Sequence, residues 1–70
     1  MKISARNQLK GKVKSVNAGS VNTEVVIELA QGVEITSIIT KASAEELNIK
    51  TGKEVYAVVK ASNVIVGVDH

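Results

Sequence analysis

Residues 22–40 read NTEVVIELAQGVEITSIIT, and this stretch decides the fold class. In residues 22–30 the odd positions from 23 to 29 are β-branched or aliphatic, and glutamates stand at 24 and 28. A period of two predicts a β-strand with one face in water. Gln31 and Gly32 predict a short turn, and the β-branched residues 33–40 predict a return strand. The stretch is therefore expected to form an antiparallel hairpin.

The segment before this hairpin predicts one more strand, over about residues 2–16. Leu9, Gly11 and Val13 alternate with three lysines at positions 10, 12 and 14, which again indicates a half-exposed strand. Gly11 in mid-strand predicts a bulge or a sharp bend of the kind that small barrels need at their corners. Residues 17–20 predict the turn that leads into the hairpin.

The pattern changes after the hairpin. Ser43 and Glu46 form a capping box, which predicts a short helix over about residues 44–48 with Leu47 packed inward. Residues 50–53 predict a turn, and two further strands are expected at residues 54–61 and 63–68. The last strand is almost entirely Val and Ile, so we expect it to be covered on both faces.

The order of these elements predicts an all-β fold, an OB-fold-like five-stranded barrel with one short helix between strands three and four. Residues 1–70 are expected to form a single domain. The chain has no cysteine for a disulfide, and its one histidine, His70, cannot form a zinc cluster alone. Tyr56 is the only aromatic residue, so the core of a monomer would be thin. We therefore expect oligomerisation to stabilise the fold.

Charge and hydropathy limit the partners and the location. The net charge of +2 is too small to indicate a polyanion ligand by itself. No apolar run approaches the roughly 18 residues that a membrane span needs. Residues 1–10 contain no apolar stretch of the signal-peptide type. A cytoplasmic location is expected.

Catalysis and nucleic-acid binding would each need residues that are scarce here. One terminal histidine and no cysteine leave no nucleophile–base set, so no enzyme is expected. Lys10, Lys12 and Lys14, with a pI of about 9.1, keep a nucleic-acid-binding OB module open as the alternative function. Such modules stack bases on several aromatic rings, whereas this chain has one. A lysine row also serves to block edge-to-edge strand pairing.

Small oxyanions suit two short segments. Ser4 and Arg6 are two residues apart, and Lys60 and Ser62 flank Ala61 in the same way, so each pair would project from one face of a strand. Hydroxyls, amides and a cation without an adjacent carboxylate can hold a tetrahedral dianion. Spacing alone leaves two interpretations open, namely an anion site or ordinary polar residues of the surface.

The same two segments carry a family resemblance. SARNQLKG at residues 4–11 resembles the opening motif of the Mop domain, the TOBE-type molybdate-binding domain of molbindins, and KAS at residues 60–62 resembles its closing motif. Residues 38–40 and 43–47, with Gly52, are similar to the middle of that domain. The resemblance covers essentially the whole chain. Asn48 departs from it, because a glycine is common there.

The resemblance implies a cytoplasmic protein that binds and stores molybdate, or the similar tungstate, with no catalysis, no cofactor and no direct protein–metal ligand. It also implies a homo-oligomer, a hexamer built as a trimer of dimers, with the anion between subunits. At the implied interfacial site Ser4 and Arg6 meet Lys60, Ala61 and Ser62 of a neighbouring subunit, with Thr40 close by. A second implied site, near the threefold axis, lies at the turn of Gly19, Ser20, Val21 and Asn22.

Overall fold

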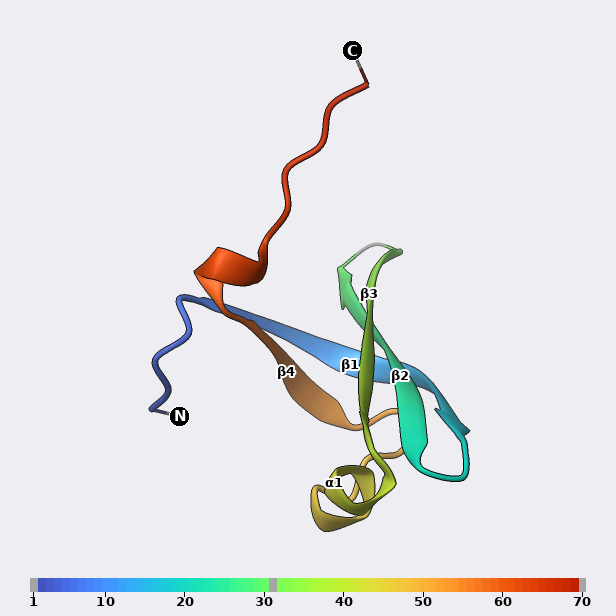
Figure 1. Cartoon of the computed structure of the whole chain (residues 1–70). Helices are drawn as coiled ribbons and strands as arrows, with labels where there is room; N and C mark the ends of the chain where they lie inside the picture. Colours follow the sequence, from blue (N-terminus) through green and yellow to red (C-terminus); the bar gives the residue numbers. More distant parts are fainter. Residues whose placement is uncertain (1, 31, 70) are drawn as a thin grey trace.

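The computed structural model describes residues 2–30 and 32–69. Gln31 of the expected hairpin turn and the terminal His70 lie outside the described residues. Figure 1 shows a curled sheet with one short helix at one end. The elements in chain order are β1 (Asn7–Ala18), β2 (Asn22–Ala30), β3 (Val33–Thr40), α1 (Lys41–Glu46), β4 (Glu54–Val59) and the 3₁₀ turn η1 (Ala61–Asn63).

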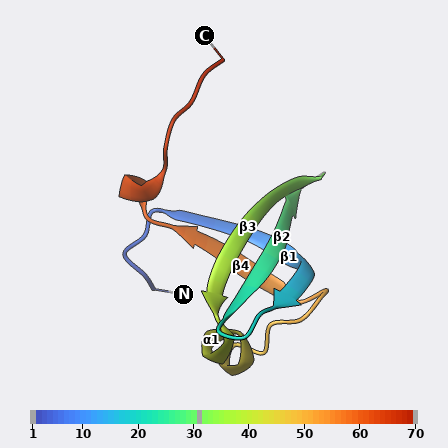
Figure 2. The ribbon, with the colours of Figure 1, turned by 45° about the vertical axis from the view of Figure 1, so that its right-hand side comes forward.

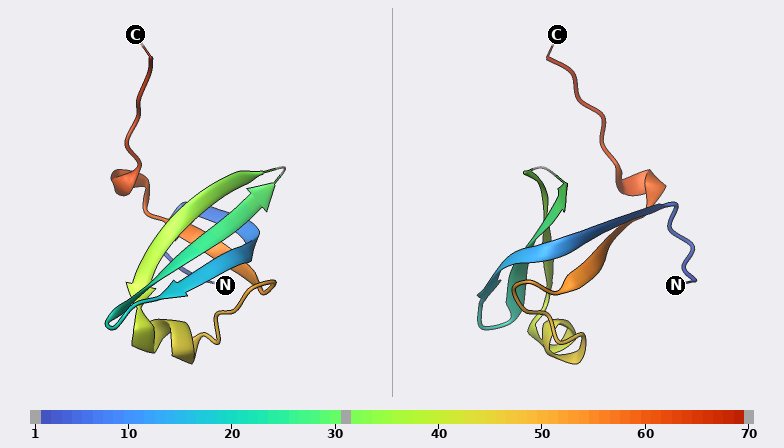
Figure 3. Two further views of the ribbon diagram at one scale, coloured as in Figure 1. Left: turned by 90° about the vertical axis from the view of Figure 1, so that its right-hand side faces the viewer. Right: turned by 180° about the vertical axis from the view of Figure 1, so that it is seen from behind.

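The four strands form one antiparallel sheet in the order β3-β2-β1-β4. The long strand β1 has two partners along its length. Its first half, from Asn7 to Lys12, pairs with β4, and its second half, from Lys12 to Ala18, pairs with β2. This division lets the sheet curl, and Figures 2 and 3 show β4 on one side and the β2–β3 hairpin on the other. β3 and β4 are the two edges of the sheet.

Gly11 stands where β1 passes from one partner to the other. A Cβ atom at Gly11 would lie 2.5 Å from the carbonyl oxygen of Glu28 and 2.8 Å from a methyl group of Ile27. The glycine therefore permits close approach of β1 and β2. The bulge expected at Gly11 occurs instead between Val13 and Ser15, where the pairing with β2 shifts register. The prediction was right that β1 is irregular and wrong about the residue.

The core lies on the concave face of the sheet. Val13, Val25, Ile27 and Ala57 form one buried cluster, and partly buried aliphatic side chains pack around it. The odd positions of β2 point inward as the alternation predicts, with Thr23 only 2% exposed. The hairpin over residues 22–40, with both strands in antiparallel register, is thus confirmed.

The helix begins earlier than the sequence predicts. Thr40, not Ser43, is the N-cap, because its hydroxyl oxygen accepts a hydrogen bond from the amide of Ser43. Leu47 is 58% exposed, so the expectation that it packs inward was wrong, and Ala44 is the buried helix residue. Asn48 has a φ of 55°, a left-handed value that explains why glycine suits the position.

The expected fifth strand is absent from the described part of the chain. β4 ends at Val59, η1 follows, and residues 64–69 run away from the sheet (Figure 1). The apolar side chains of this tail are 53–93% exposed. The all-β class and the helix between strands three and four are confirmed, but the sheet has four strands rather than five. The Val and Ile content of residues 63–68 indicates that the segment suits a strand and cannot show where the pairing partner lies.

The close approach at Gly11 leads to the first prediction. Gly11→Ala forces the backbone of β1 away from that of β2, which should lower the free energy of unfolding by roughly 1–3 kcal/mol. Urea denaturation monitored by circular dichroism measures this change. Ser15→Ala, on an exposed position of the same strand, is the control and should change it little. Equal stability of Gly11→Ala and the unaltered chain would contradict the close approach.

Candidate functional site

The two segments expected to bind an oxyanion lie at the same end of the β1–β4 ladder. The ladder ends at the pair Asn7–Val59, where the Asn7 side-chain amide donates to the Val59 carbonyl oxygen (3.2 Å). Arg6 directly precedes this pair on one strand and Lys60 directly follows it on the other. The two segments therefore leave the sheet from the same end, and Figure 1 shows the N-terminal segment and η1 running in different directions from there. We call this region, comprising Ser4, Arg6, Lys60, Ala61 and Ser62, the basic end.

The basic end has no carboxylate nearby in the sequence. Residues 2–23 and 55–68 contain no Asp or Glu. The side chains of Arg6 and Lys60 are exposed, and neither takes part in an ion pair among residues 2–30 and 32–69. The described part of the chain thus leaves these two cations uncompensated, and their local potential favours an anion. All five residues of the basic end are exposed to solvent. One chain therefore offers an open surface rather than an enclosed anion site.

Backbone hydrogen bonds give the basic end its local shape. In η1 the amide of Asn63 donates to the Lys60 carbonyl oxygen (2.8 Å), and the amide of Val64 donates to that of Ala61 (3.2 Å). On the opposite segment the Gln8 side chain donates to the Ala5 carbonyl oxygen (3.2 Å). The hydroxyl groups of Ser4 and Ser62 make no hydrogen bond within the described part of the chain.

Thr40 lies elsewhere in the chain. Thr40 pairs with Asn22, the first residue of β2. Its hydroxyl group donates to the Ser43 hydroxyl oxygen (2.8 Å) as part of the helix cap. Figure 1 shows α1 and the β1–β2 turn at the end of the sheet opposite η1. The structure therefore does not bring Thr40 together with Arg6 and Lys60 of the same chain.

The turn of Gly19, Ser20, Val21 and Asn22 lies beside Thr40. The Gly19 amide donates to the Asn22 carbonyl oxygen (2.7 Å), and the amide of Lys41 donates to the Val21 carbonyl oxygen (2.8 Å). The Gly19 amide is therefore already used within the turn. Val21 is 70% exposed, so an aliphatic side chain stands at the tip of the turn. Lys41 is a cation that the sequence analysis did not associate with this turn.

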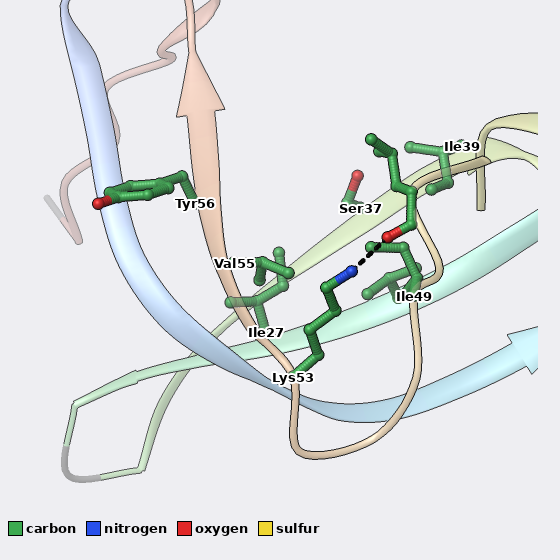
Figure 4. A pocket seen from close by; sticks show the side chains of 9 residues that line it. Ile27, Ser37, Ile39, Ile49, Lys53, Val55 and Tyr56 are labelled. Carbon is green, nitrogen blue, oxygen red and sulfur yellow. Dashed lines mark hydrogen bonds between the residues drawn. The ribbon is translucent and has the colours of Figure 1, made fainter. Parts of the chain in front are cut away.

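Sequence reasoning missed the hollow inside the curled sheet. A cavity of about 310 Å³ lies between the concave face and the end of the helix, and Figure 4 shows its lining. Its walls are mostly aliphatic, and the Lys53 ammonium group at its rim donates to the carbonyl oxygens of Leu47 and Asn48. A second hollow of about 170 Å³ lies between the edge strands, with Ile35 and Tyr56 among its lining residues. The scarcity of aromatic residues was the available signal, because small side chains fill a barrel poorly.

The lysine row of β1 is largely neutralised by glutamates. Lys14 forms an ion pair and hydrogen bond with Glu34, and this bond raises the pKa of the lysine. Lys10 lies 4.0 Å from the carboxylate of Glu54. A track for a nucleic-acid backbone needs unpaired cations, so the row favours a solvated strand face.

The described residues contain neither a cluster of metal ligands nor a helix suited to span a membrane. No three His, Cys, Asp or Glu side chains come together in a way that could hold a metal ion among residues 2–30 and 32–69. Within that same part of the chain, no helix is both long and apolar enough to span a membrane.

Comparison with known proteins gives the family. The family model described as the TOBE domain matches residues 3–66. The chain belongs to the TOBE domain family. A probable molybdenum-pterin-binding protein from Haemophilus influenzae is 54% identical over 69 residues, which is 99% of this chain and 100% of that protein.

Solved structures of similar proteins share the fold of this TOBE domain. MopII from Clostridium pasteurianum superposes with a TM-score of 0.90 at 54% identity, over 96% of this chain and 100% of that chain. A molybdate-bound form of the cytoplasmic molybdate-binding protein ModG superposes with a TM-score of 0.92 at 51% identity, over 97% of this chain and 48% of that one. The expected OB-like class and the expected resemblance to the Mop domain are both confirmed.

The position of Thr40 leads to the second prediction. Thr40→Ala removes the helix cap and should lower the free energy of unfolding by about 1 kcal/mol. Thermal unfolding measures the loss. Thr36→Ala is the matched control, because Thr36 is an exposed threonine of the same strand that does not cap the helix. If the two variants unfold at the same temperature, the cap assigned to Thr40 is wrong.

Proposed function

We propose that this chain binds molybdate, as an intact oxyanion, at sites formed between copies of the chain. The carboxylate-free basic end is the observation that carries the proposal. Support also comes from the relatives, whose names describe binding of molybdate or of a molybdenum pterin. We further propose that the protein serves in cytoplasmic storage of molybdate and accepts tungstate similarly.

The chemistry of the basic end suits a tetrahedral dianion. The Arg6 guanidinium and the Lys60 ammonium supply charge, and the Ser4 and Ser62 hydroxyls supply neutral donors. Hydrogen bonds to charged groups contribute roughly 1.5–3 kcal/mol each, so several together can offset the loss of water around the anion. Because two of these four donors are neutral hydroxyls, the site allows the anion to be released again, which is what a store requires.

A single basic end is too exposed to enclose an anion. Its residues stand at a solvent-exposed end of the ladder, where water competes for every donor. A second copy that covers this end would exclude water and supply donors from the opposite side. For this reason the proposed site lies between subunits, with Ser4 and Arg6 facing Lys60, Ala61 and Ser62 across the interface.

The unfinished barrel supports assembly. Two edge strands, β3 and β4, are left without outer partners in the sheet, and the groove between them is open. The same chain has an apolar, extended tail whose Ile65 and Val66 are 93% and 86% exposed. We propose that the tail of one copy docks as the fifth strand between β3 and β4 of a second copy. The docked side chains would also reach the hollow beneath, which the chain's own small residues leave unfilled.

The direction of the tail favours a second copy over closure on the same barrel. The two hydrogen bonds of η1 turn the chain away from the groove. In both views of Figure 3 the tail extends beyond the sheet and does not lie along β3 or β4. A tail that docked on its own sheet would have to take a different direction after η1.

We also propose that such dimers assemble further, into a hexamer. A hexamer made of three such dimers would bury the aliphatic residues still exposed on the outside, among them Val21 and Ile38 at 70% and 68%. We propose the second anion site at the turn 19–22, where Thr40 and Lys41 lie beside it. Several copies of the turn would have to converge there.

The third prediction concerns the cation at the basic end. Arg6→Glu should weaken molybdate binding by roughly 10–100-fold or more, because it removes a charged donor and adds a repelling carboxylate. Isothermal titration with molybdate measures the affinity. Lys50→Glu is the control, since it makes the same kind of charge change at an exposed turn residue far along the chain. No heat from the unaltered chain at millimolar molybdate would overturn the proposed function.

The fourth prediction concerns assembly. Val66→Lys places a charge in the proposed groove of the partner and should shift the protein to monomers at micromolar concentration. Val66→Ile keeps an apolar β-branched side chain and should leave the assembly intact. Native mass spectrometry counts the subunits. A monomeric unaltered chain that nevertheless binds molybdate would point to closure of the tail on its own barrel.

A further inference from the structure

We propose that Asn7 is a positioning residue of the oxyanion site, because its side-chain amide ties the start of β1 to the end of β4 and so sets the directions in which Arg6 and Lys60 leave the sheet. The proposal rests on the proposed function, since it takes these two cations as anion donors. Its basis is one hydrogen bond, from the Asn7 side-chain nitrogen Nδ2 to the Val59 carbonyl oxygen (3.2 Å), between residues 52 positions apart in the sequence.

This hydrogen bond acts on the backbone next to both cations. The Val59 carbonyl belongs to the peptide group that joins Val59 to Lys60, and the backbone nitrogen of Asn7 belongs to the peptide group that joins Arg6 to Asn7. A peptide group is planar, so a constraint on the Val59 carbonyl oxygen also constrains the backbone nitrogen of Lys60. One side chain therefore holds the two departing segments relative to each other.

The Asn7 side chain makes the last link across the ladder before the two segments separate. Asn7–Val59 is the terminal pair, and within the described part of the chain no hydrogen bond joins residues 2–6 to residues 60–69. The Gln8 side chain donates to the Ala5 carbonyl oxygen, but this contact is exposed and local to the N-terminal segment. It cannot relate Arg6 to Lys60.

The surroundings of Asn7 suit a positioning role. Asn7 and Val59 are half-buried, whereas the neighbouring Arg6 and Lys60 are exposed. A hydrogen bond that is partly shielded from water is electrostatically stronger than an exposed one, so it can hold the backbone while the charged groups stay accessible. Long cationic side chains lose conformational freedom when they bind a ligand, and a backbone that is already held lowers this cost.

The position of the hydrogen bond also predicts which anion sites it serves. In the proposed assembly each chain gives Arg6 to one interfacial site and Lys60 to another. Loss of the Asn7 amide would therefore loosen one donor at each of two sites. All interfacial sites should weaken together, and their number should not change.

The test removes the amide in two ways. Asn7→Ala deletes the side chain beyond its first carbon, and Asn7→Leu keeps a similar volume without a donor. Asn17→Ala is the matched control, because Asn17 is an exposed asparagine of the same strand whose side chain makes no hydrogen bond in the described part of the chain. Isothermal titration measures molybdate affinity and stoichiometry, and nitrogen-15 relaxation without molybdate measures backbone order.

Both Asn7 variants should bind molybdate about tenfold more weakly at unchanged stoichiometry, which is the size of effect expected when a group that orients a ligand-binding residue is lost. The order parameters of the Arg6 and Lys60 amides should fall from about 0.85 to below about 0.6, while those of the β2–β3 hairpin stay unchanged. The control should match the unaltered chain in both measurements.

Three results would count against the proposal. Unchanged affinity in either Asn7 variant would overturn the positioning role and leave the proposed function standing. A loss of affinity without a loss of order at Arg6 and Lys60 would also overturn it, because the amide would then act in some other way. Failure of the unaltered chain to bind molybdate would overturn both the positioning role and the proposed function.

Discussion

The shared strand β1 is the constraint on which the rest of the structure depends. Because β1 pairs with β4 in its first half and with β2 in its second, the sheet must curl around the core at Val13. The curl leaves β3 and β4 as separate edges with a groove between them. The same pairing places Arg6 and Lys60 directly beyond the terminal pair Asn7–Val59, so one ladder shapes the incomplete barrel and brings the two candidate segments to one end of the sheet.

The sequence predicted those features that depend on local pattern. Alternation over residues 22–40 identified the β2–β3 hairpin, because a half-buried strand imposes a period of two. The helix was expected between strands three and four, where it occurs, but it begins at Lys41 because Thr40, still extended at the end of β3, is the N-cap in place of Ser43. The fifth strand expected over residues 63–68 is not part of the described sheet, since apolar residues indicate that a segment can pair and not where its partner lies.

The sequence selected candidate residues for the site but did not predict how they are arranged in space. Motif and donor chemistry selected Ser4, Arg6, Lys60, Ala61 and Ser62 as candidates, and the ladder shows only that their two segments adjoin the same terminal pair, Asn7–Val59. Thr40 could not be assigned from spacing, because its position follows from the pairing with Asn22. The cavity inside the curled sheet could not be predicted either, because its size depends on the distance between side chains on opposite walls. The match of residues 3–66 to the TOBE domain agrees with this fold.

The account's central claim is that oxyanions are held at the basic end, between adjoining copies of the chain. Crystals grown with molybdate and measured at the molybdenum absorption edge would locate the metal directly. The account predicts an anomalous peak within hydrogen-bonding reach of Arg6 on one side and of Lys60 and Ser62 on the other, contributed by two different copies. Peaks that lie only in the apolar hollow, or a fully loaded site enclosed by one copy, would contradict it.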